Sequence, residues 1–203
     1  MDKISKELKA VAQDIFLKGY EKASQSFSSL SGEQVSIKNF ELFFGEAPDL
    51  LQKIIKTNNP SILITDIIGE AKGRSYLVFS EKDAQVVPDM LIRKMKSLQS
   101  NPDFVEIILK EVDNMVSAAV ITELSNQLDL KIYGDVPKIV FPDEANREWL
   151  QDEIEHNEDM FAILSSANFA FEDNMKISPY FIWILDKQFY SVLNHKKLSY
   201  ADR

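Results

Sequence analysis

The chain has 203 residues, a formal net charge of −9 and no cysteine, with 45 % hydrophobic and 27 % charged residues. This balance is typical of a chain that buries a core, and the lack of cysteine excludes disulfides, thiolate nucleophiles and cysteine-ligated zinc. The acidic charge argues against nucleic-acid binding, which requires a concentrated basic face, and the one cationic cluster, at residues 93–96, is short.

Membrane and metal functions are also not expected. No run approaches 18 consecutive apolar residues, and residues 1–7 lack the apolar stretch of a secretory signal, so we expect a cytoplasmic protein. The only two histidines are His156 and His195. Because they are far apart in the sequence, we expect surface or helix-end residues and no metal site.

In the first half, the sequence predicts helix, strand, helix, hairpin and helix. A long helix over residues 3–29, ended by Ser31-Gly32, is predicted by apolar residues at spacings of three and four: Ile4, Leu8, Val11, Ile15, Gly19, Ala23 and Phe27. The next elements are a strand over 34–37, a helix over 48–56, and a hairpin of 62–67 with 75–79 that turns at Lys72-Gly73. Ser80 and Asp83 resemble a capping box that opens a further helix, and Pro88 is expected to kink this helix or to start a new one.

The second half repeats this order of elements. Pro102 suits the first turn of a second long helix, over residues 103–128. The later elements are a strand over 130–133, an acidic helix over 144–155, a hairpin of 160–171 with 176–185 around residues 172–174, and a closing helix over 187–194.

The repeat predicts the fold class. Neither hairpin is stable alone, so the halves 1–100 and 101–203 are expected to share one antiparallel-rich sheet in a single domain over residues 1–203. We expect an α+β fold with pseudo-twofold symmetry and with the two long helices side by side on one face of the sheet. The alternative is coincidence, because mixed chains often alternate helices and strands.

The second long helix carries the candidate site. At 100° per residue, one arc is expected to face the core: Val105, Ile108, Leu109, Val112, Val116 and Ala119. Glu111 and Asn114 are neighbours on the other side, flanked by Ile107, Ala118 and Ile121. Small and apolar groups around one acid and one amide suit a docking surface. The alternative is a helix packed on both sides.

The sequence around this helix carries a motif. It reads Glu111-Val112-Asp113-Asn114, continues through an alanine-rich segment to Leu124-Ser125, and reaches Val136-Pro137 with 22 residues between Asn114 and Pro137. This pattern resembles that of the CheC/CheX/FliY chemotaxis phosphatases, which carry an acid or serine, then Glu-x-x-Asn, then a distant proline. Residues 67–80 are similar to the sheet hairpin of that family.

The resemblance implies a phosphatase that hydrolyses the aspartyl phosphate of a CheY-like response regulator. The partner would be the phosphorylated receiver domain, which holds its own Mg²⁺, so no cofactor, metal or covalent intermediate is expected on this chain. Asn114 would position the attacking water and Glu111 would pair with a lysine of the receiver. Ile107, Ala118 and Ile121 would form the surface that docks the partner.

Two departures from the family pattern matter. Ile107 stands where the family usually has Asp or Ser, so we expect weaker docking or a different choice of partner. The first long helix aligns with Asp14 and Leu17 in place of the acid and the amide, and Glu21 and Phe40 take the places of Ala118 and Pro137. A leucine cannot orient a water, so this second site is expected to be degenerate.

Two other functions remain open. A non-catalytic interaction module of a signalling or switch complex is favoured by Ile107 and opposed by Asn114. A small-molecule binding domain would use the aromatic residues of the second hairpin, which are more typical of a core or a dimer interface: Phe169, Phe171, Tyr180, Phe181 and Trp183. An exposed edge strand would also allow a homodimer.

Overall fold

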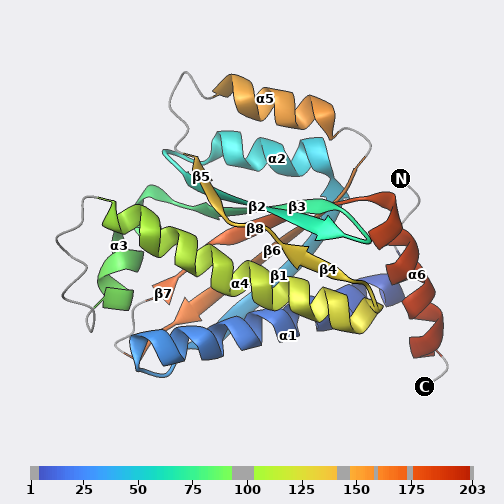
Figure 1. Ribbon diagram of the computed structural model, residues 1–203, viewed down its shortest axis with the longest axis horizontal. Coiled ribbons are helices and arrows are strands. Elements are labelled where there is room, and N and C mark those ends of the chain that lie inside the picture. The colour runs from blue at the N-terminus through green and yellow to red at the C-terminus, as the bar shows by residue number, and fades with distance from the viewer. Residues whose placement is uncertain (1–4, 93–102, 141–146, 158–159, 173–175, 202–203) are drawn as a thin grey trace.

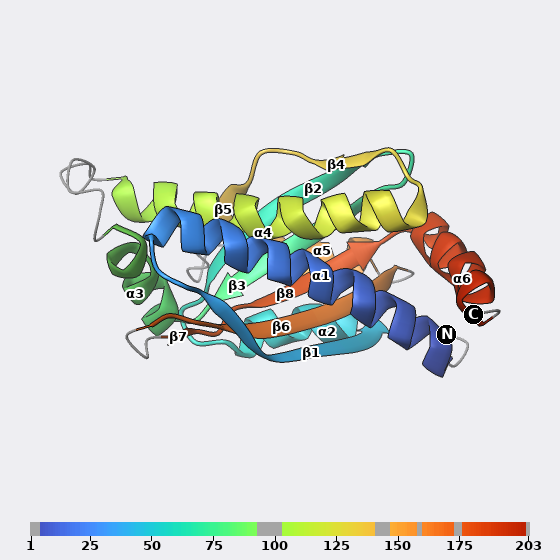
Figure 2. The same cartoon turned by 90° about the horizontal axis from the view of Figure 1, so that it is seen from below.

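The long helices cover one face of a central sheet. The computed structural model describes residues 5–92, 103–140, 147–157, 160–172 and 176–201. The helices are α1 (Lys6–Ser31), α2 (Ala47–Lys56), α3 (Glu81–Ile92), α4 (Phe104–Leu128), α5 (Arg147–His156) and α6 (Lys187–Ala201). Figures 1 and 2 show α1 and α4 side by side on one face, α2 and α5 on the other, and α3 and α6 at opposite ends. The predicted α+β class and the pairing of the long helices are confirmed.

The described residues form one eight-stranded sheet. Its strands are β1 (Ser36–Glu46), β2 (Ser61–Gly69), β3 (Gly73–Phe79), β4 (Ile132–Gly134), β5 (Lys138–Val140), β6 (Phe161–Ala170), β7 (Lys176–Ile177) and β8 (Tyr180–Leu185). The order is β1-β6-β8-β3-β2-β4, with β5 also on β2 and β7 on β6, and the pairs are antiparallel. Both predicted hairpins, β2–β3 and β6–β8, are confirmed and lie in the middle of the sheet.

The two halves exchange their edge strands. β1 pairs with β6 of the second half, whereas β4 and β5 pair with β2 of the first half. One extra residue interrupts each edge at the same place: residues 39 and 40 stand opposite residue 167, and residues 135–137 stand opposite residues 65 and 66. A coincidental repeat of elements does not predict a shared bulge, so the topology favours the pseudo-twofold arrangement.

Several predicted boundaries are wrong. β1 spans 11 residues, far more than the predicted 34–37, because alternate side chains such as Leu42 and Phe44 pack against the core. α3 continues through Pro88, where Val87 is fully buried and anchors the helix. β5 was not predicted, and α6 extends beyond 194. Ile4, the cationic cluster at 93–96, Pro102, residues 144–146 and the hairpin tip at 173–174 lie outside the described residues.

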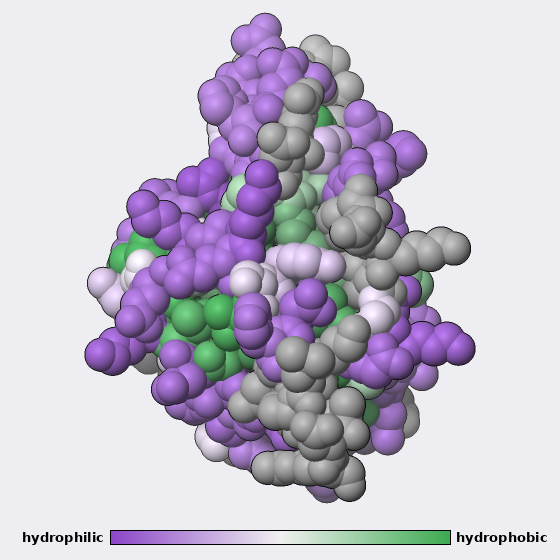
Figure 3. Space-filling model, turned by 90° about the vertical axis from the view of Figure 1, so that its right-hand side faces the viewer, coloured by the Kyte–Doolittle hydropathy of each residue, from purple (hydrophilic) through white to green (hydrophobic). Residues whose placement is uncertain are grey.

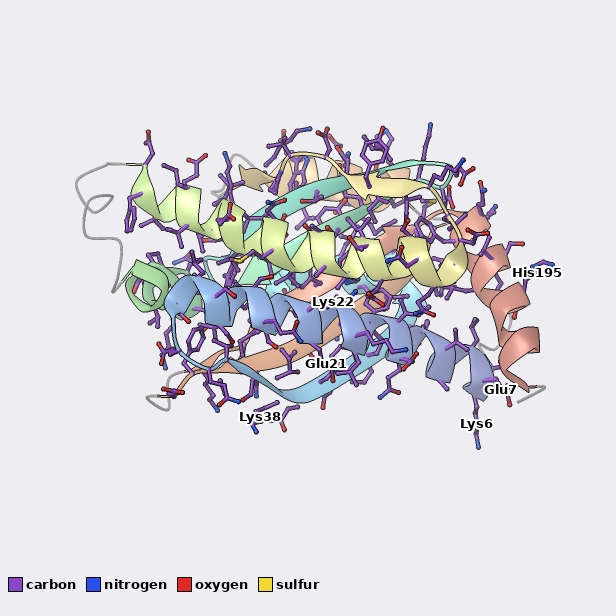
Figure 4. The ribbon with its side chains drawn as sticks, turned by 60° about the horizontal axis from the view of Figure 1, so that its bottom comes forward. Lys6, Glu7, Glu21, Lys22, Lys38 and His195 are labelled. Atoms are coloured by element: carbon purple, nitrogen blue, oxygen red, sulfur yellow. The ribbon has the colours of Figure 1, made fainter. Side chains whose placement is uncertain are left out.

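The core fills the layer between the long helices and the sheet. Gly19 lets the helices cross closely, because a Cβ atom there would lie 2.7 Å from the Val120 Cα. Lys22 also pairs with the buried Glu123 across the two helices, and Figure 4 shows Lys22 between them. Four of the five hairpin aromatics are buried here, and Tyr180 is half-buried, so the interpretation of this group as core is confirmed.

Candidate functional site

Glu111 and Asn114 line a groove between α4 and the bulge that joins β4 to β5. Both side chains are exposed, while Ile108, Val112 and Val116 on the opposite side of α4 are buried. The groove has a volume of about 400 Å³, and its walls are Ile107, Lys110, Glu111 and Asn114 from α4 and residues 134–137 from the edge. The fold therefore brings the Glu-x-x-Asn segment and the distant proline into one site.

The bulge is held against β2 and α4 by specific contacts. The Asp135 N–H donates to the Asp66 carbonyl at 2.8 Å, and the Val136 N–H donates to Asp135 Oδ1 at 2.7 Å. Gly134 lies so close to α4 that a Cβ atom there would be 3.0 Å from Ile121 Cδ1. Pro137 has no N–H to donate, which suits a bulge where the ladder is interrupted. The edge strand leaves α4 at this bulge and opens the groove beside Asn114.

The rim of the groove is apolar on both walls. Ile107 is 43 % exposed on α4, and Val136 is 73 % exposed on the bulge. Large exposed apolar side chains that frame a polar pair are typical of a surface that a partner covers. By contrast, the end of the molecule that carries α6 is mostly hydrophilic, with its apolar residues in separate areas (Figure 3). Sequence reasoning missed Val136 as a rim residue, although it adjoins the proline of the motif.

Two predicted positions on α4 are wrong. Ile121, expected on the docking surface with Ile107 and Ala118, is only 2 % exposed because β4 covers this part of the helix. Val105, expected in the core, is 44 % exposed because it lies in the first turn of α4, before the packed part of the helix. Ile107 and Ala118 are exposed, and their role in docking stays a prediction. The alternative interpretation, a helix packed on both sides, is therefore correct for the part of α4 around Ile121.

A carboxyl group is buried beneath the groove. Asp113 is fully buried, and its Oδ2 accepts a hydrogen bond from Thr65 Oγ1 at 2.5 Å. Its Oδ1 has no hydrogen-bond partner among the described residues. Burial raises the pKa of Asp113, and the hydrogen bond from the Thr65 hydroxyl lowers it by a smaller amount, so that the pKa lies at about 7. Sequence reasoning treated Asp113 only as a spacer within Glu-x-x-Asn.

The sequence matches no protein-family model and no curated protein sequence, but the structure matches several solved structures. FliY from Thermotoga maritima has a TM-score of 0.72 at 15 % identity, covering 96 % of this chain and 99 % of that chain. The FliM middle domain from H. pylori has a TM-score of 0.61 at 14 % identity, covering 94 % and 99 %. CheX in the CheX–CheY–BeF₃–Mg²⁺ complex from Borrelia burgdorferi has a TM-score of 0.50 at 16 % identity, covering 85 % and 97 %.

This chain has the CheC-like fold. The expected resemblance to CheC, CheX and FliY is thereby confirmed for the fold. Within the CheC-like fold, the face of α1 that corresponds to the groove is built differently. Asp14 is bonded to Lys18 at 2.8 Å, and Leu17 is half-buried. Phe40, at the place of Pro137, packs against Tyr20 of α1 with ring centroids 5.3 Å apart.

The opposite face of the CheC-like sheet carries a second polar cluster, in a cavity of about 500 Å³. Arg74 donates to Asp66 and to Glu153 of α5, each at 2.6 Å, and the Tyr76 hydroxyl donates to Glu153. Burial, followed by its contact with Glu153, raises the pKa of Tyr76. These groups satisfy one another, so the cluster ties α5 to the β2–β3 hairpin.

In the parts of the chain that the structure describes, no group of three or more His, Asp or Glu side chains is arranged to hold a metal ion. None of the helices described is both long and apolar enough to cross a membrane.

Proposed function

We propose that this chain is a phosphatase that hydrolyses the aspartyl phosphate of a CheY-like receiver domain. The observation that carries the proposal is the exposure of Glu111 and Asn114, one helical turn apart, in a groove that Pro137 also lines. The match to CheX supports it, because that protein was solved in a complex with CheY, BeF₃ and Mg²⁺. The chemistry required is limited, since the receiver domain supplies both the phosphoryl group and the metal ion.

Asn114 would position the attacking water. The reaction forms a bond between the water oxygen and phosphorus, breaks the bond between phosphorus and the aspartate oxygen, and releases inorganic phosphate. An amide side chain both donates and accepts hydrogen bonds, so Asn114 can hold a water in line with the bond that breaks. Its exposure on a long, well-anchored helix allows it to reach a partner's phosphoryl group.

Glu111 and the apolar rim would dock the receiver domain. The Glu111 carboxylate suits a charge-assisted hydrogen bond to a lysine beside the phosphoryl site. Ile107 and Val136 provide apolar contact on the two walls of the groove. Apolar contacts at the centre of an interface commonly carry much of the binding energy, whereas the charged pair fixes the register.

The decisive experiment measures phosphate loss from a phosphorylated receiver domain of the same organism, with and without this chain. The proposal expects decay that is faster with the chain and that saturates as the chain is added in excess. Binding is measured in parallel on receiver domain activated with beryllium fluoride. Binding without any acceleration of phosphate loss contradicts the phosphatase proposal.

The second candidate is a non-catalytic interaction module of a signalling or switch complex. Ile107 favours it, because an exposed isoleucine replaces the acid or serine expected beside the Glu-x-x-Asn segment. The likeness to FliM is consistent with it, since the H. pylori FliM domain was also solved in complexes with FliG and with SpeE. Tight binding of a partner that leaves its phosphoryl lifetime unchanged is the result that this candidate predicts.

A further inference from the structure

Asp113 is a polar residue where the fold accepts an apolar one. Its counterpart on α1 is Phe16, because Phe16 precedes Leu17 as Asp113 precedes Asn114. Phe16 is fully buried, and the centroid of its ring lies 5.4 Å from that of Trp183. A buried carboxyl with one unpartnered oxygen destabilises a protein relative to such an apolar side chain. Core packing alone therefore does not account for Asp113.

The partner of Asp113 follows the same pattern. Thr65 on β2 stands opposite the bulge at 135–137, and the corresponding position on β6, opposite the bulge at 39–40, is Ala167. Phe16 and Ala167 are both buried apolar residues. The polar pair of Asp113 and Thr65 thus occurs in the half that contains the groove and is replaced by apolar residues in the other half.

This pair connects α4 to the wall of the groove. The Thr65 hydroxyl donates to Asp113 at 2.5 Å, and its methyl group would lie 3.1 Å from a Cβ atom on Gly134. The next residue, Asp66, accepts the Asp135 N–H at 2.8 Å through its carbonyl oxygen. The bulge is therefore held by two consecutive residues of β2, the first of which is bonded to α4 one position before Asn114.

We propose that Asp113 is a positioning residue, which holds α4 on β2 through Thr65 and so fixes Asn114 relative to the opposite wall of the groove. Its effect on turnover rests on the proposed function, whereas its effect on the geometry of the groove does not. Asn114 can orient a water only if its distance from the docked partner is fixed, and displacements of about 1 Å can reduce catalysis by up to about 100-fold.

The state of the carboxyl group gives this role a pH dependence. Burial holds the pKa of Asp113 near 7, so the group is neutral below that pH and ionises above it. Nearby charges are engaged elsewhere: Asp66 pairs with Arg74 and Lys138, and Lys110 pairs with Glu106. Lys22 of α1 pairs with Glu123 of α4. Glu111 and Asp135 are exposed to solvent.

The test compares variants of Asp113 and Thr65 with a matched control. Asp113→Asn keeps an acceptor for Thr65 but cannot ionise, whereas Asp113→Ala and Thr65→Val each remove the hydrogen bond. Glu123→Gln is the control, because it neutralises another buried acid of α4 that lies outside the groove. Turnover and KM are measured on a phosphorylated receiver domain between pH 5.5 and 8.5, and amide NMR shifts of Gly134 and Asp135 are recorded without a partner.

Turnover of the wild type should change near pH 7, where Asp113 ionises, and Asp113→Asn should remove that change. Thr65→Val should lower turnover about tenfold with little change in KM, and adding Asp113→Ala should lower it no further, because both act through one bond. The Gly134 and Asp135 amides should titrate near pH 7 in the wild type and not in Asp113→Asn. Glu123→Gln should leave turnover, its pH profile and these amides unchanged.

Each outcome decides the proposal. If Thr65→Val and Asp113→Asn lower the melting temperature but retain wild-type turnover and pH profile, Asp113 has only a structural role. If the wild type has no phosphatase activity, the proposed function fails by itself, and the amide shifts decide the inference. Groove amides that neither titrate near pH 7 nor move in Thr65→Val then overturn it. Thr65→Val, which replaces a side chain of nearly the same shape, keeps the test valid if Asp113→Ala does not fold.

Discussion

The two long helices share a backbone arrangement but present different chemistry to the two edges of the sheet. Beside α4, an exposed acid and amide face a bulge that ends in Pro137. Beside α1, the equivalent bulge carries Phe40, which packs against the helix, and Leu17 replaces the amide. The groove therefore depends on a few side chains, because the bulge itself is present in both halves.

The largest difference between the two halves is the buried carboxyl group of Asp113, whose counterpart in the first half is Phe16. The pKa of Asp113 is raised to about 7 from a value near 4 in the unfolded chain, so the folded state binds more protons between these values. The contribution of Asp113 to stability should therefore be most favourable below about pH 4 and should fall, by about 4 kcal/mol, as the pH rises to about 7. Asp113→Asn should abolish this component. Urea unfolding at several pH values measures it, and identical pH curves for the two proteins contradict it.

Asn114→Ala should have the largest effect on function. If Asn114 positions the water, its loss should slow dephosphorylation by roughly 100-fold or more, as for other lost catalytic groups. Affinity for the phosphorylated receiver domain should change little, because the interaction is made in the transition state. Stopped-flow dephosphorylation and a binding titration on the same preparation separate the two quantities. Full turnover in Asn114→Ala would assign the groove to binding alone.

Glu111→Ala should affect binding and turnover together. A charge-assisted contact contributes about 1–3 kcal/mol, which corresponds to a weakening of roughly 5- to 150-fold. The exposed position of Glu111 means that the melting temperature should hardly change. Raising the salt concentration should reduce the difference in affinity for the receiver domain between the variant and the wild type, because salt screens the charged pair. A loss of turnover with unaltered affinity contradicts the docking role.

Ile107→Ala should weaken docking by less, roughly three- to tenfold, because it removes part of one apolar contact. Turnover at saturating partner should be unchanged. Phe43→Ala is the matched control, since Phe43 is similarly exposed but lies on β1, away from the groove. Equal effects of the two substitutions in a binding titration would show that Ile107 has no particular role in docking.

Asp14→Ala should have the smallest effect, with turnover within about twofold of the wild type. Its partner is a half-buried lysine one turn away, in an ion pair that solvent still screens, so stability should change by less than about 0.5 kcal/mol. The same dephosphorylation assay measures this. A large loss in a normally folded Asp14→Ala protein would show that the face of α1 is functional, and would remove the contrast between the halves.

Periodicity was sufficient to predict the main elements, the central hairpins and the packing of the long helices. It failed where tertiary contacts decide burial. Ile121 and Asn114 lie on nearly the same side of α4, and β4 covers only the former. No local pattern indicates how far an edge strand extends along a helix. The bulge at 135–137 and the bond between Asp113 and Thr65 likewise join segments that are distant in the sequence.

The exchanged edge strands have a consequence for synthesis of the chain on the ribosome. β1 has no partner until β6 emerges, more than 100 residues later, because residues 36–46 pair with residues 161–170. Contacts between such distant segments slow folding, and an unpaired strand is open to aggregation meanwhile. We therefore expect the first half to remain incompletely folded, with Leu42 and Phe44 exposed, until most of the protein has been synthesised. Chaperones that shield extended apolar segments should accordingly bind the nascent chain in this interval.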